Sequence, residues 1–259
     1  MITIKKPHEF EKMAAAGRCV AAIHRQLKDV AAPGITTAEL DAMAAKIMRE
    51  HDCTPSFLGY HGFPGHICAS PNEVIVHGIP GSYALQEGDI FSLDVGAIYD
   101  GWHADAALTF AIGDVSPTVA TLLAETERAL WEGIRAVQPG ARTGDVGAAV
   151  EAVGEQNDYG IVREYVGHGI GRAMHEQPQV PNYGKAGVGT KLKTGMAICI
   201  EPMFNLGGQD TVLLDDDWTV VTADGSLSAH FEHTVALTQD GIKVLTAAES
   251  DLSAGLQNS

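Results

Sequence analysis

An internal repeat constrains the fold of this 259-residue chain more than any other feature of the sequence. Residues 136–158 match residues 30–52 at a constant offset of 106. In both copies a Pro-Gly breaker precedes a threonine, the residue type that caps helix N-termini, and a helical apolar pattern follows. The aligned pairs are Pro33 and Pro139, Gly34 and Gly140, Thr37 and Thr143, Leu40 and Val146, Ala44 and Val150, Ile47 and Val153, and Asp52 and Asp158. The repeat predicts one domain built of two related α+β halves, with a cleft along their seam.

The same order of elements is expected in both halves. Helical stretches at about 8–29 and 117–137 precede the Pro-Gly breakers, and a second helix follows each breaker. In the first copy Thr36 and Glu39 spell a T-x-x-E capping box. Strand-like sequence follows at 67–79, 89–99, 102–113, 161–170, 195–206, 218–238 and 241–246. We therefore predict the α+β class, with a first half at about 8–115, a second at about 116–246 and a short tail at 247–259.

The charge balance and the cysteines exclude several classes of protein. Asp and Glu outnumber Lys and Arg by 33 to 17, so the formal net charge is −16 and no nucleic-acid or anionic-lipid surface is expected. No apolar run approaches the ~18 residues that span a bilayer, and the first ten residues lack the apolar core of a signal peptide. Four scattered cysteines without a CxxC pair indicate free thiols in a reducing compartment. We expect a soluble, cytoplasmic protein without a membrane partner.

Two acidic residues interrupt the apolar strands of the first half. Asp94 lies inside the strand predicted at 89–99, where an unpaired ionised group would cost several kcal/mol. Asp100-Gly101 is a strong signal for a two-residue hairpin turn. That turn pairs Asp94 with Ala107 and makes Asp105 its diagonal neighbour on the same face, with Cβ atoms about 7–8 Å apart. Two carboxylates this close require a cation or a proton, so both are candidate metal ligands.

The second half supplies three matching residues. Glu201 ends the apolar strand 196–200, Glu232 stands among strand formers, and His168 is framed by glycines that let the backbone approach closely. Each of them alone is also typical of a solvated strand edge, an ion pair or a structural histidine. Taken together, four carboxylates match the charge of two divalent ions. Oxygen-rich ligation with one imidazole suits Mn, Fe or Co, with Zn as an alternative, and differs from a Cys/His structural zinc site.

Five motifs carry a resemblance to a known family. They are VHGIP at 76–80, DIFSLDVGAIYDGWHADAALTF at 89–110, REYVGHGIGRAMHEQPQVPNYG at 163–184, IEPMFN at 200–205 and WTVVTADGSLSAHFEHT at 218–234. In this order they resemble the type I methionine aminopeptidases, which are pita-bread metallopeptidases, and the likeness runs from about residue 3 to 246. The resemblance implies the pita-bread (creatinase/aminopeptidase) fold, whose pseudo-twofold-related halves surround a central antiparallel-rich sheet with flanking helices. It also implies a single catalytic domain covering 1–259.

The resemblance implies a ligand role for the five candidate residues. Asp105 and Glu232 would bridge two divalent ions (Co, Mn, Fe or Zn). Asp94 would complete the first metal site, and His168 with Glu201 would complete the second.

Catalytic and substrate-binding roles follow from the same resemblance. Glu201 would shuttle a proton toward the leaving amine, and His175 would hydrogen-bond the carbonyl oxygen of the scissile peptide. His77 would hold the scissile amide or the next residue. The methionine pocket would be lined by Tyr60, Phe63, Cys68, Met174 and Trp218.

The implied activity is removal of the N-terminal methionine from nascent proteins and peptides when the second residue is small. A monomer with transient ribosome contact is expected. The acidic segment 215–217 is unusual for a protein that works at the ribosome, and Lys185, Lys191 and Lys193 are a basic alternative or simply a solvated face. Two further departures are Ala106-Ala107, where relatives often have Thr-Ser, and Phe57, which would narrow the pocket mouth.

Two rival interpretations remain. A prolidase or aminopeptidase P shares the fold and the metal set, but usually carries a large extra N-terminal domain for which 259 residues leave no room. A non-catalytic binding module would be expected to have lost metal ligands, whereas all five candidates, His77 and His175 are present.

Overall fold

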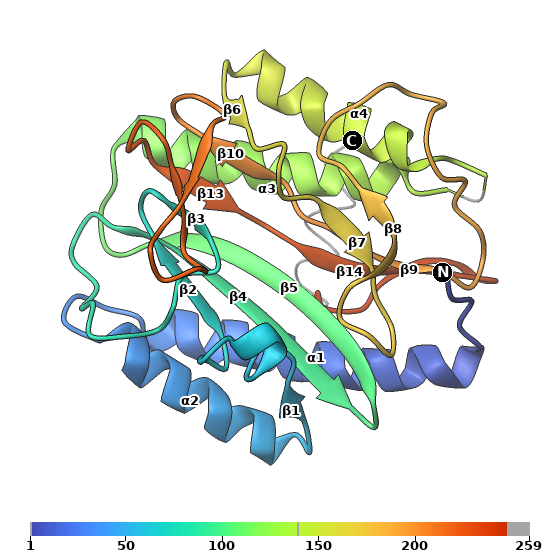
Figure 1. Cartoon of the computed structure of the whole chain (residues 1–259), viewed down its shortest axis with the longest axis horizontal. Coiled ribbons are helices and arrows are strands. Elements are labelled where there is room, and N and C mark those ends of the chain that lie inside the picture. Colours follow the sequence, from blue (N-terminus) through green and yellow to red (C-terminus); the bar gives the residue numbers. More distant parts are fainter. Residues whose placement is uncertain (1, 139, 248–259) are drawn as a thin grey trace.

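Four helices flank the sheets in the computed structural model, which describes residues 2–138 and 140–247. They are α1 (Pro7–Val30), α2 (Thr37–Glu50), α3 (Pro117–Ala136) and α4 (Thr143–Gln156). Helices α1 and α2 lie on one side of the long β4–β5 hairpin, and α3 and α4 lie on the opposite side of the molecule (Figure 1). The helices expected at 8–29 and 117–137 are confirmed to within a residue at each end. Pro139 and residues 248–259 of the predicted tail lie outside the described residues.

Two larger antiparallel sheets meet at the seam between the halves. The first contains β1 (Thr54–Pro55), β2 (Cys68–Pro71), β4 (Ile90–Tyr99) and β5 (Trp102–Ala111). The second runs in the order β15 (Gly241–Val244), β14 (His233–Thr238), β9 (Ala197–Ile200), β7 (Gly167–Gly169) and β8 (Glu176–Val180). This arrangement confirms the predicted α+β class.

Two small sheets and one short helix complete the fold. One sheet joins β13 (Ser228–His230), β10 (Met203–Asn205) and β6 (Gly160–Ile161), and the other joins β11 (Thr211–Leu213), β12 (Val220–Thr222) and β3 (Val74–Val76). The 3-10 turn η1 covers Tyr60–Gly62. The continuous strand predicted at 218–238 is therefore wrong, because the chain divides there into β12, β13 and β14. An alternating apolar pattern does not reveal where a strand changes partners.

Equivalent hydrogen bonds reveal the repeat in three dimensions. In the first half Gly34 N donates to Leu85 O (2.7 Å), and in the second Gly140 N donates to Leu192 O (3.2 Å). The returning bonds, from Leu85 N to Ile35 O and from Leu192 N to Ala141 O, are also paired. Each helix pair thus docks on its own half in the same way, as the sequence repeat predicts.

The capping prediction is right in one half and wrong in the other. Thr36 caps α2 and forms the expected capping box with Glu39. Arg142 stands at the N-cap of α4, so Thr143 is already the first helical residue. The Thr143 hydroxyl instead accepts a hydrogen bond from Thr190 N (3.2 Å), just as the Thr37 hydroxyl accepts one from Gly81 N (2.9 Å). These threonines tie their helices to neighbouring loops.

The β4–β5 hairpin is the rigid support of the first half. Asp100 and Gly101 both have positive φ, as a two-residue primed turn requires, and Asp94 lies opposite Ala107 as predicted. The hairpin's apolar side packs on α1 and α2 in a dry core that includes Ile23, Leu27 and Leu93. Strand β5 of the hairpin also contacts the segment that leads into β14 of the second sheet, because Glu232 N donates to Ala107 O (2.8 Å).

None of the helices in the described part of the chain is long and apolar enough to cross a membrane.

Candidate metal centre and substrate pocket

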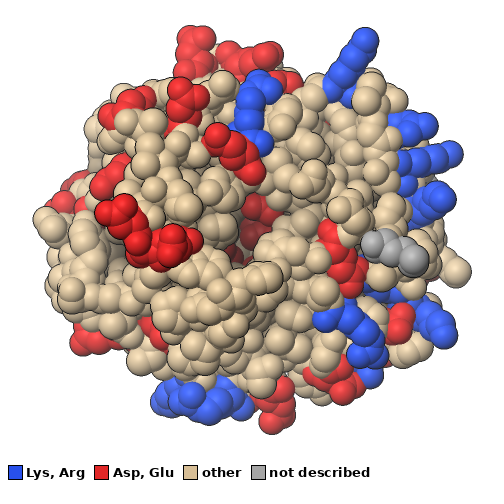
Figure 2. All heavy atoms as spheres, in the orientation of Figure 1, with Lys and Arg blue, Asp and Glu red and all other residues tan. Residues whose placement is uncertain are grey.

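A cavity of about 330 Å³ opens at the seam between the two halves. Figure 2 shows it as a hollow near the centre of the face, with acidic side chains at its floor. Its lining includes every residue that the sequence singled out: Asp94, Asp105, His168, Glu201, Glu232, His77, His175, Tyr60, Phe63, Cys68, Met174 and Trp218. The two halves therefore contribute to one site, as the repeat predicts.

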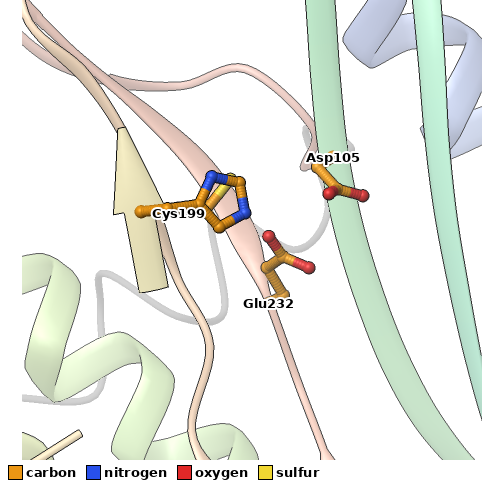
Figure 3. Close-up of side chains that lie close together, drawn as sticks. Asp105, Cys199 and Glu232 are labelled. Carbon is orange, nitrogen blue, oxygen red and sulfur yellow. The ribbon is translucent and has the colours of Figure 1, made fainter. Parts of the chain in front are cut away.

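The five candidate ligands converge from five different segments. Asp94 lies on β4, Asp105 on β5 and His168 on β7, while Glu201 follows β9 and Glu232 precedes β14. Asp94 and Glu232 are 9% and 2% exposed. The carboxylates of Asp105 and Glu232 point toward the same space in Figure 3. Ligand atoms of Asp105, His168, Cys199 and Glu232 all lie within 4.8 Å of one another.

Cys199 lies close to the candidate ligands, but its thiol differs from them chemically. Its thiol is buried and lies 3.6 Å from the Thr234 hydroxyl. Burial, and then the charges of Glu232 and Asp105, raise the pKa of the Cys199 thiol. Without metal the thiol therefore stays protonated beside the carboxylates, and Cys199 is a cluster member that the motifs do not indicate as a ligand.

The unpaired atoms of the cluster test whether a metal fits. Asp94 Oδ1, Asp105 Oδ1 and Glu232 Oε1 are buried without a hydrogen-bond partner. His168 Nδ1 donates to Gly169 O (2.9 Å), which leaves the Nε2 lone pair free, 3.7 Å from Glu201 Oε1. Lone pairs directed into one buried space, with an imidazole fixed by a backbone carbonyl, are what divalent-metal sites provide. The residues present fit a metal centre.

The electrostatics of the cluster also call for a cation. Burial raises the pKa of Asp105 to about 7, and burial together with the charge of Asp105 raises the pKa of Glu201 to about 8. The pKa values of Asp94 and Glu232 are likewise raised, first by burial and then by the other carboxylates. Burial lowers the pKa of His168 to about 3, so its imidazole is neutral and able to act as a ligand. A bound cation would reverse the penalty on all four carboxylates.

Two further histidines line the cavity beside the cluster. His175 Nδ1 lies 2.8 Å from the Tyr60 hydroxyl, and its ring packs on that of His168 at 4.3 Å between centroids. His77 has a positive φ of 60° and packs edge-on against Tyr165 and Trp218. Burial lowers the pKa of His77 to about 4 and also lowers that of His175. Both imidazoles are therefore neutral and can donate or accept a hydrogen bond.

The rest of the cavity is an apolar wall. Phe57, Phe63, Cys68 and Met174 form one buried cluster, against which Tyr60 and Trp218 pack. Phe57 is 4% exposed and lines the cavity as part of this wall, and the narrowing of the pocket mouth stays a prediction. The second departure is Ala106-Ala107, where relatives often have hydroxyl side chains. Here the Thr234 hydroxyl accepts a hydrogen bond from Asp105 N (2.9 Å) and stabilises the backbone beside these alanines.

His230 is a cavity residue that the sequence analysis missed. It is 2% exposed, and its Nε2 atom has no hydrogen-bond partner and lies 3.9 Å from Glu201 Oε2. The signal was available, because His230 precedes Glu232 by two residues and alternate residues of an extended segment face the same side.

The fold and the site define a class. Residues 11–239 match the family model of metallopeptidase family M24, and the chain belongs to that family. Methionine aminopeptidase 1 of Bacillus subtilis is 47% identical over 246 residues, which cover 95% of this chain and 99% of the relative. Methionine aminopeptidase A of Synechocystis is 49% identical over 249 residues, covering 96% and 98%. Within M24 the chain groups with the type I methionine aminopeptidases, as the motifs predict.

Solved structures lead to the same group. The crystal structure of methionine aminopeptidase from Thermotoga maritima superposes with a TM-score of 0.94 at 42% identity, covering 96% of this chain and 100% of that one. Prolidase from Pyrococcus furiosus shares the fold, with a TM-score of 0.76 at 22% identity, but only 66% of that chain is covered. The pita-bread fold is thereby confirmed.

Proposed function

We propose that this chain removes N-terminal methionine from nascent proteins and peptides whose second residue is small, using two divalent metal ions. The observation that carries the proposal is the convergence of four buried carboxylates and one neutral imidazole beside an apolar pocket. The burial of these carboxylates and the repulsion between them support bound metal as the source of the compensating charge.

The ligand assignment divides the cluster between two ions. Asp105 and Glu232 would hold both ions together, and each carries a buried oxygen without a hydrogen-bond partner. Asp94 would complete one ion from the hairpin. His168 and Glu201, whose facing atoms are 3.7 Å apart, would complete the other from the second half. When bound, such a metal pair supplies a water of lowered pKa as the nucleophile.

Tyr60 sets the hydrogen-bonding role of His175. Burial raises the pKa of the Tyr60 phenol, so it keeps its proton and would donate it to His175 Nδ1 in the tautomer that turnover requires. The remaining proton of the neutral imidazole then sits on Nε2, from which it can be donated to the carbonyl oxygen of the scissile peptide as negative charge develops.

Glu201 and His77 would act on the other side of the scissile bond. Glu201 lines the cavity among the candidate metal ligands, and its carboxylate, ionised when metal is bound, would accept a proton from the attacking water and release it to the leaving amine. His77 is held by Tyr165 and Trp218 at the edge of the cavity, and it would hold the scissile amide or the following residue.

The apolar wall would select methionine. Aromatic rings and the Met174 thioether suit an unbranched thioether side chain, because sulfur makes favourable contacts with ring edges. The free α-amine of the substrate would occupy a solvent position at the metal centre, which accounts for cleavage at the N-terminus alone. We further propose that the enzyme acts as a cytoplasmic monomer that contacts the ribosome transiently.

Methionine release from Met-Ala-Ser tests the proposal. Chelator-stripped protein should be inactive, and it should recover when Mn, Co, Fe or Zn is added back, with the best metal identified by rate. Met-Leu-Ser and an X-Pro peptide are the matched controls and should be cleaved slowly or not at all. A folded protein that binds metal but cleaves none of the peptides would instead be a binding module. Cleavage of X-Pro alone would place it with the prolidases.

A further inference from the structure

The N-terminal segment is built into the wall of the cavity by a buried ion pair. Lys5 Nζ lies 2.9 Å from Glu176 Oε2, and the two side chains are only 2% and 8% exposed. Glu176 directly follows His175 and begins β8, at the end of the turn 170–175 that joins β7 to β8. The ion pair therefore connects the beginning of the chain to the turn that carries His175 and Met174.

Glu176 gathers hydrogen bonds from both segments. Its Oε2 accepts from Lys5 and from the Thr3 hydroxyl, and its Oε1 accepts from Arg172 N (3.0 Å) and Ala173 N (3.3 Å). Burial alone would raise the pKa of Glu176, but the hydrogen bonds from Thr3 and Lys5 outweigh it and hold the pKa below its usual value. The carboxylate therefore stays ionised and links the N-terminal segment to the turn 170–175.

The surrounding backbone leaves the pair little freedom. Lys5 N donates to Gly195 O (2.7 Å), and Ile2 forms a parallel bridge with Gln177. A Cβ atom on Gly171 would lie 2.6 Å from Lys5 Cε and 2.7 Å from Glu176 Oε1, so the turn closes tightly over the ion pair. Lys5 is thus fixed at both its backbone and its ammonium group.

We propose that Lys5 and Glu176 are positioning residues that hold the turn 170–175, and with it His175, in the geometry required for turnover. The inference rests on the proposed function, in which His175 donates to the scissile carbonyl. Its Tyr60 bond and its packing on His168 both depend on where the turn places the ring. A shift of about 1 Å in a group of this kind can cost about 10²-fold in rate.

Lys5→Met keeps most of the apolar stem and removes the ammonium group, which leaves Glu176 buried without its cation. We expect kcat per metal-loaded site to fall by at least about 10-fold, while KM for Met-Ala-Ser changes by less than about 3-fold. Arg128→Met is the matched control, because Arg128 pairs with Glu125 on the same surface helix at 2.9 Å. It should stay within about 2-fold of the parent, since this partly exposed pair does not line the cavity.

The double variant Lys5→Met with Glu176→Gln separates positioning from general loss of structure. Gln keeps an oxygen for Arg172 N and Ala173 N but carries no unpaired charge. We expect it to recover about 3-fold or more of the kcat lost in Lys5→Met, because an unpaired buried charge is more disruptive than a neutral pair.

Hydrogen exchange of the peptide covering 171–177 gives a readout that does not require activity. In Lys5→Met its amides should exchange faster by about 10-fold or more, while Arg128→Met leaves them unchanged. Unchanged exchange together with parental kcat per metal-loaded site would overturn the inference. If the parent itself cleaves no peptide, the proposed function fails and hydrogen exchange alone decides whether the ion pair holds the turn.

Discussion

One wall of the cavity carries acidic side chains on the long hairpin and beside β14, whereas the facing wall consists of aromatic rings and a thioether. The acidic wall is held by regular ladders, such as the uninterrupted β4–β5 pairing that places Asp94 opposite Ala107. The apolar wall is assembled mostly from irregular segments, namely η1 with its flanking residues, the turn 170–175 and the segment before β12, and only Cys68 comes from a strand, β2. Without metal the first wall costs stability, because buried carboxylates repel one another, while the second contributes stability by burying apolar surface.

Asp105→Asn removes one carboxylate charge from the acidic wall and has the largest expected effect on activity. Loss of a bridging carboxylate should reduce kcat/KM by at least about 10³-fold, since that factor corresponds to several kcal/mol of lost transition-state stabilisation. The same change should raise the melting temperature of the chelated protein, because it removes one of the mutually repelling buried carboxylates. Activity assays and thermal unfolding with and without chelator measure both effects.

Asp100→Asn is the matched control for that variant, because it makes the same exchange at the tip of the same hairpin, where the carboxylate pairs with Lys12 outside the cavity. It should leave metal binding and turnover near parental values. An Asp105→Asn protein that keeps its metal and its activity would contradict the ligand assignment.

His175→Ala tests the junction of the two walls, where a polar group reaches the substrate without belonging to the metal cluster. We expect kcat to fall by about 10²–10³-fold, the usual consequence of losing a donor to a developing oxyanion. Metal content, measured by isothermal titration, should stay unchanged. Tyr60→Phe should show a smaller loss, because the ring remains in place and only its orienting hydrogen bond is removed. Loss of metal from His175→Ala would show that the residue belongs to the cluster instead.

The pH dependence of the unfolding free energy measures how much the buried carboxylates of the acidic wall destabilise the protein without metal. Folding raises the pKa of Asp105 to about 7 and of Glu201 to about 8, so the folded state binds these protons more tightly than the unfolded chain. By linkage, their contribution to the unfolding free energy falls as pH rises through this interval. His168 and His230, whose pKa values are lowered to about 3, act in the opposite direction, but only below the ordinary histidine pKa of about 6.5.

Between about pH 7.5 and 8.5, where the histidines of the unfolded chain are already neutral, the buried carboxylates dominate the slope. The melting temperature of the chelated protein should fall across this range. With metal bound it should not fall, because metal displaces the protons and binds more tightly as pH rises. A chelated protein whose melting temperature rises over the same range would contradict the idea that unpaired carboxylates dominate the site.

The two walls also differ in how far the sequence predicts them. Period-two alternation and one Asp-Gly turn were sufficient to place Asp94 and Asp105 on one face, because strand register is a local property. The Tyr60–His175 contact joins residues 115 positions apart through two irregular turns, and no periodic pattern encodes such a contact. The motif resemblance supplied those residues, but not the buried position of Phe57, the Lys5–Glu176 pair or the cavity position of His230.

Phe57→Leu probes the apolar wall and has the smallest expected effect on rate. The Phe57 ring packs edge-on against Phe63 at 6.3 Å between centroids, and a Cβ on Gly96 would lie 2.8 Å from its Cε1 atom, so the ring fills the wall closely. Turnover of Met-Ala-Ser should stay within about 10-fold, because a methylene-scale change in an apolar pocket is worth about 1–3 kcal/mol and the lower end of that range corresponds to about 5-fold. Peptides with a bulkier first residue should gain, relative to methionine, by up to about 10-fold.

Phe110→Leu makes the same exchange in the dry core, where Phe110 packs edge-on against Phe91 at 5.7 Å. Both variants should lose about 1–2 kcal/mol of stability from the cavity that Leu leaves, but only Phe57→Leu should change the choice of first residue. Equal selectivity in the two variants would mean that Phe57 supports the wall without shaping the pocket, and that selection depends on the residues packed around it, Phe63 and Met174.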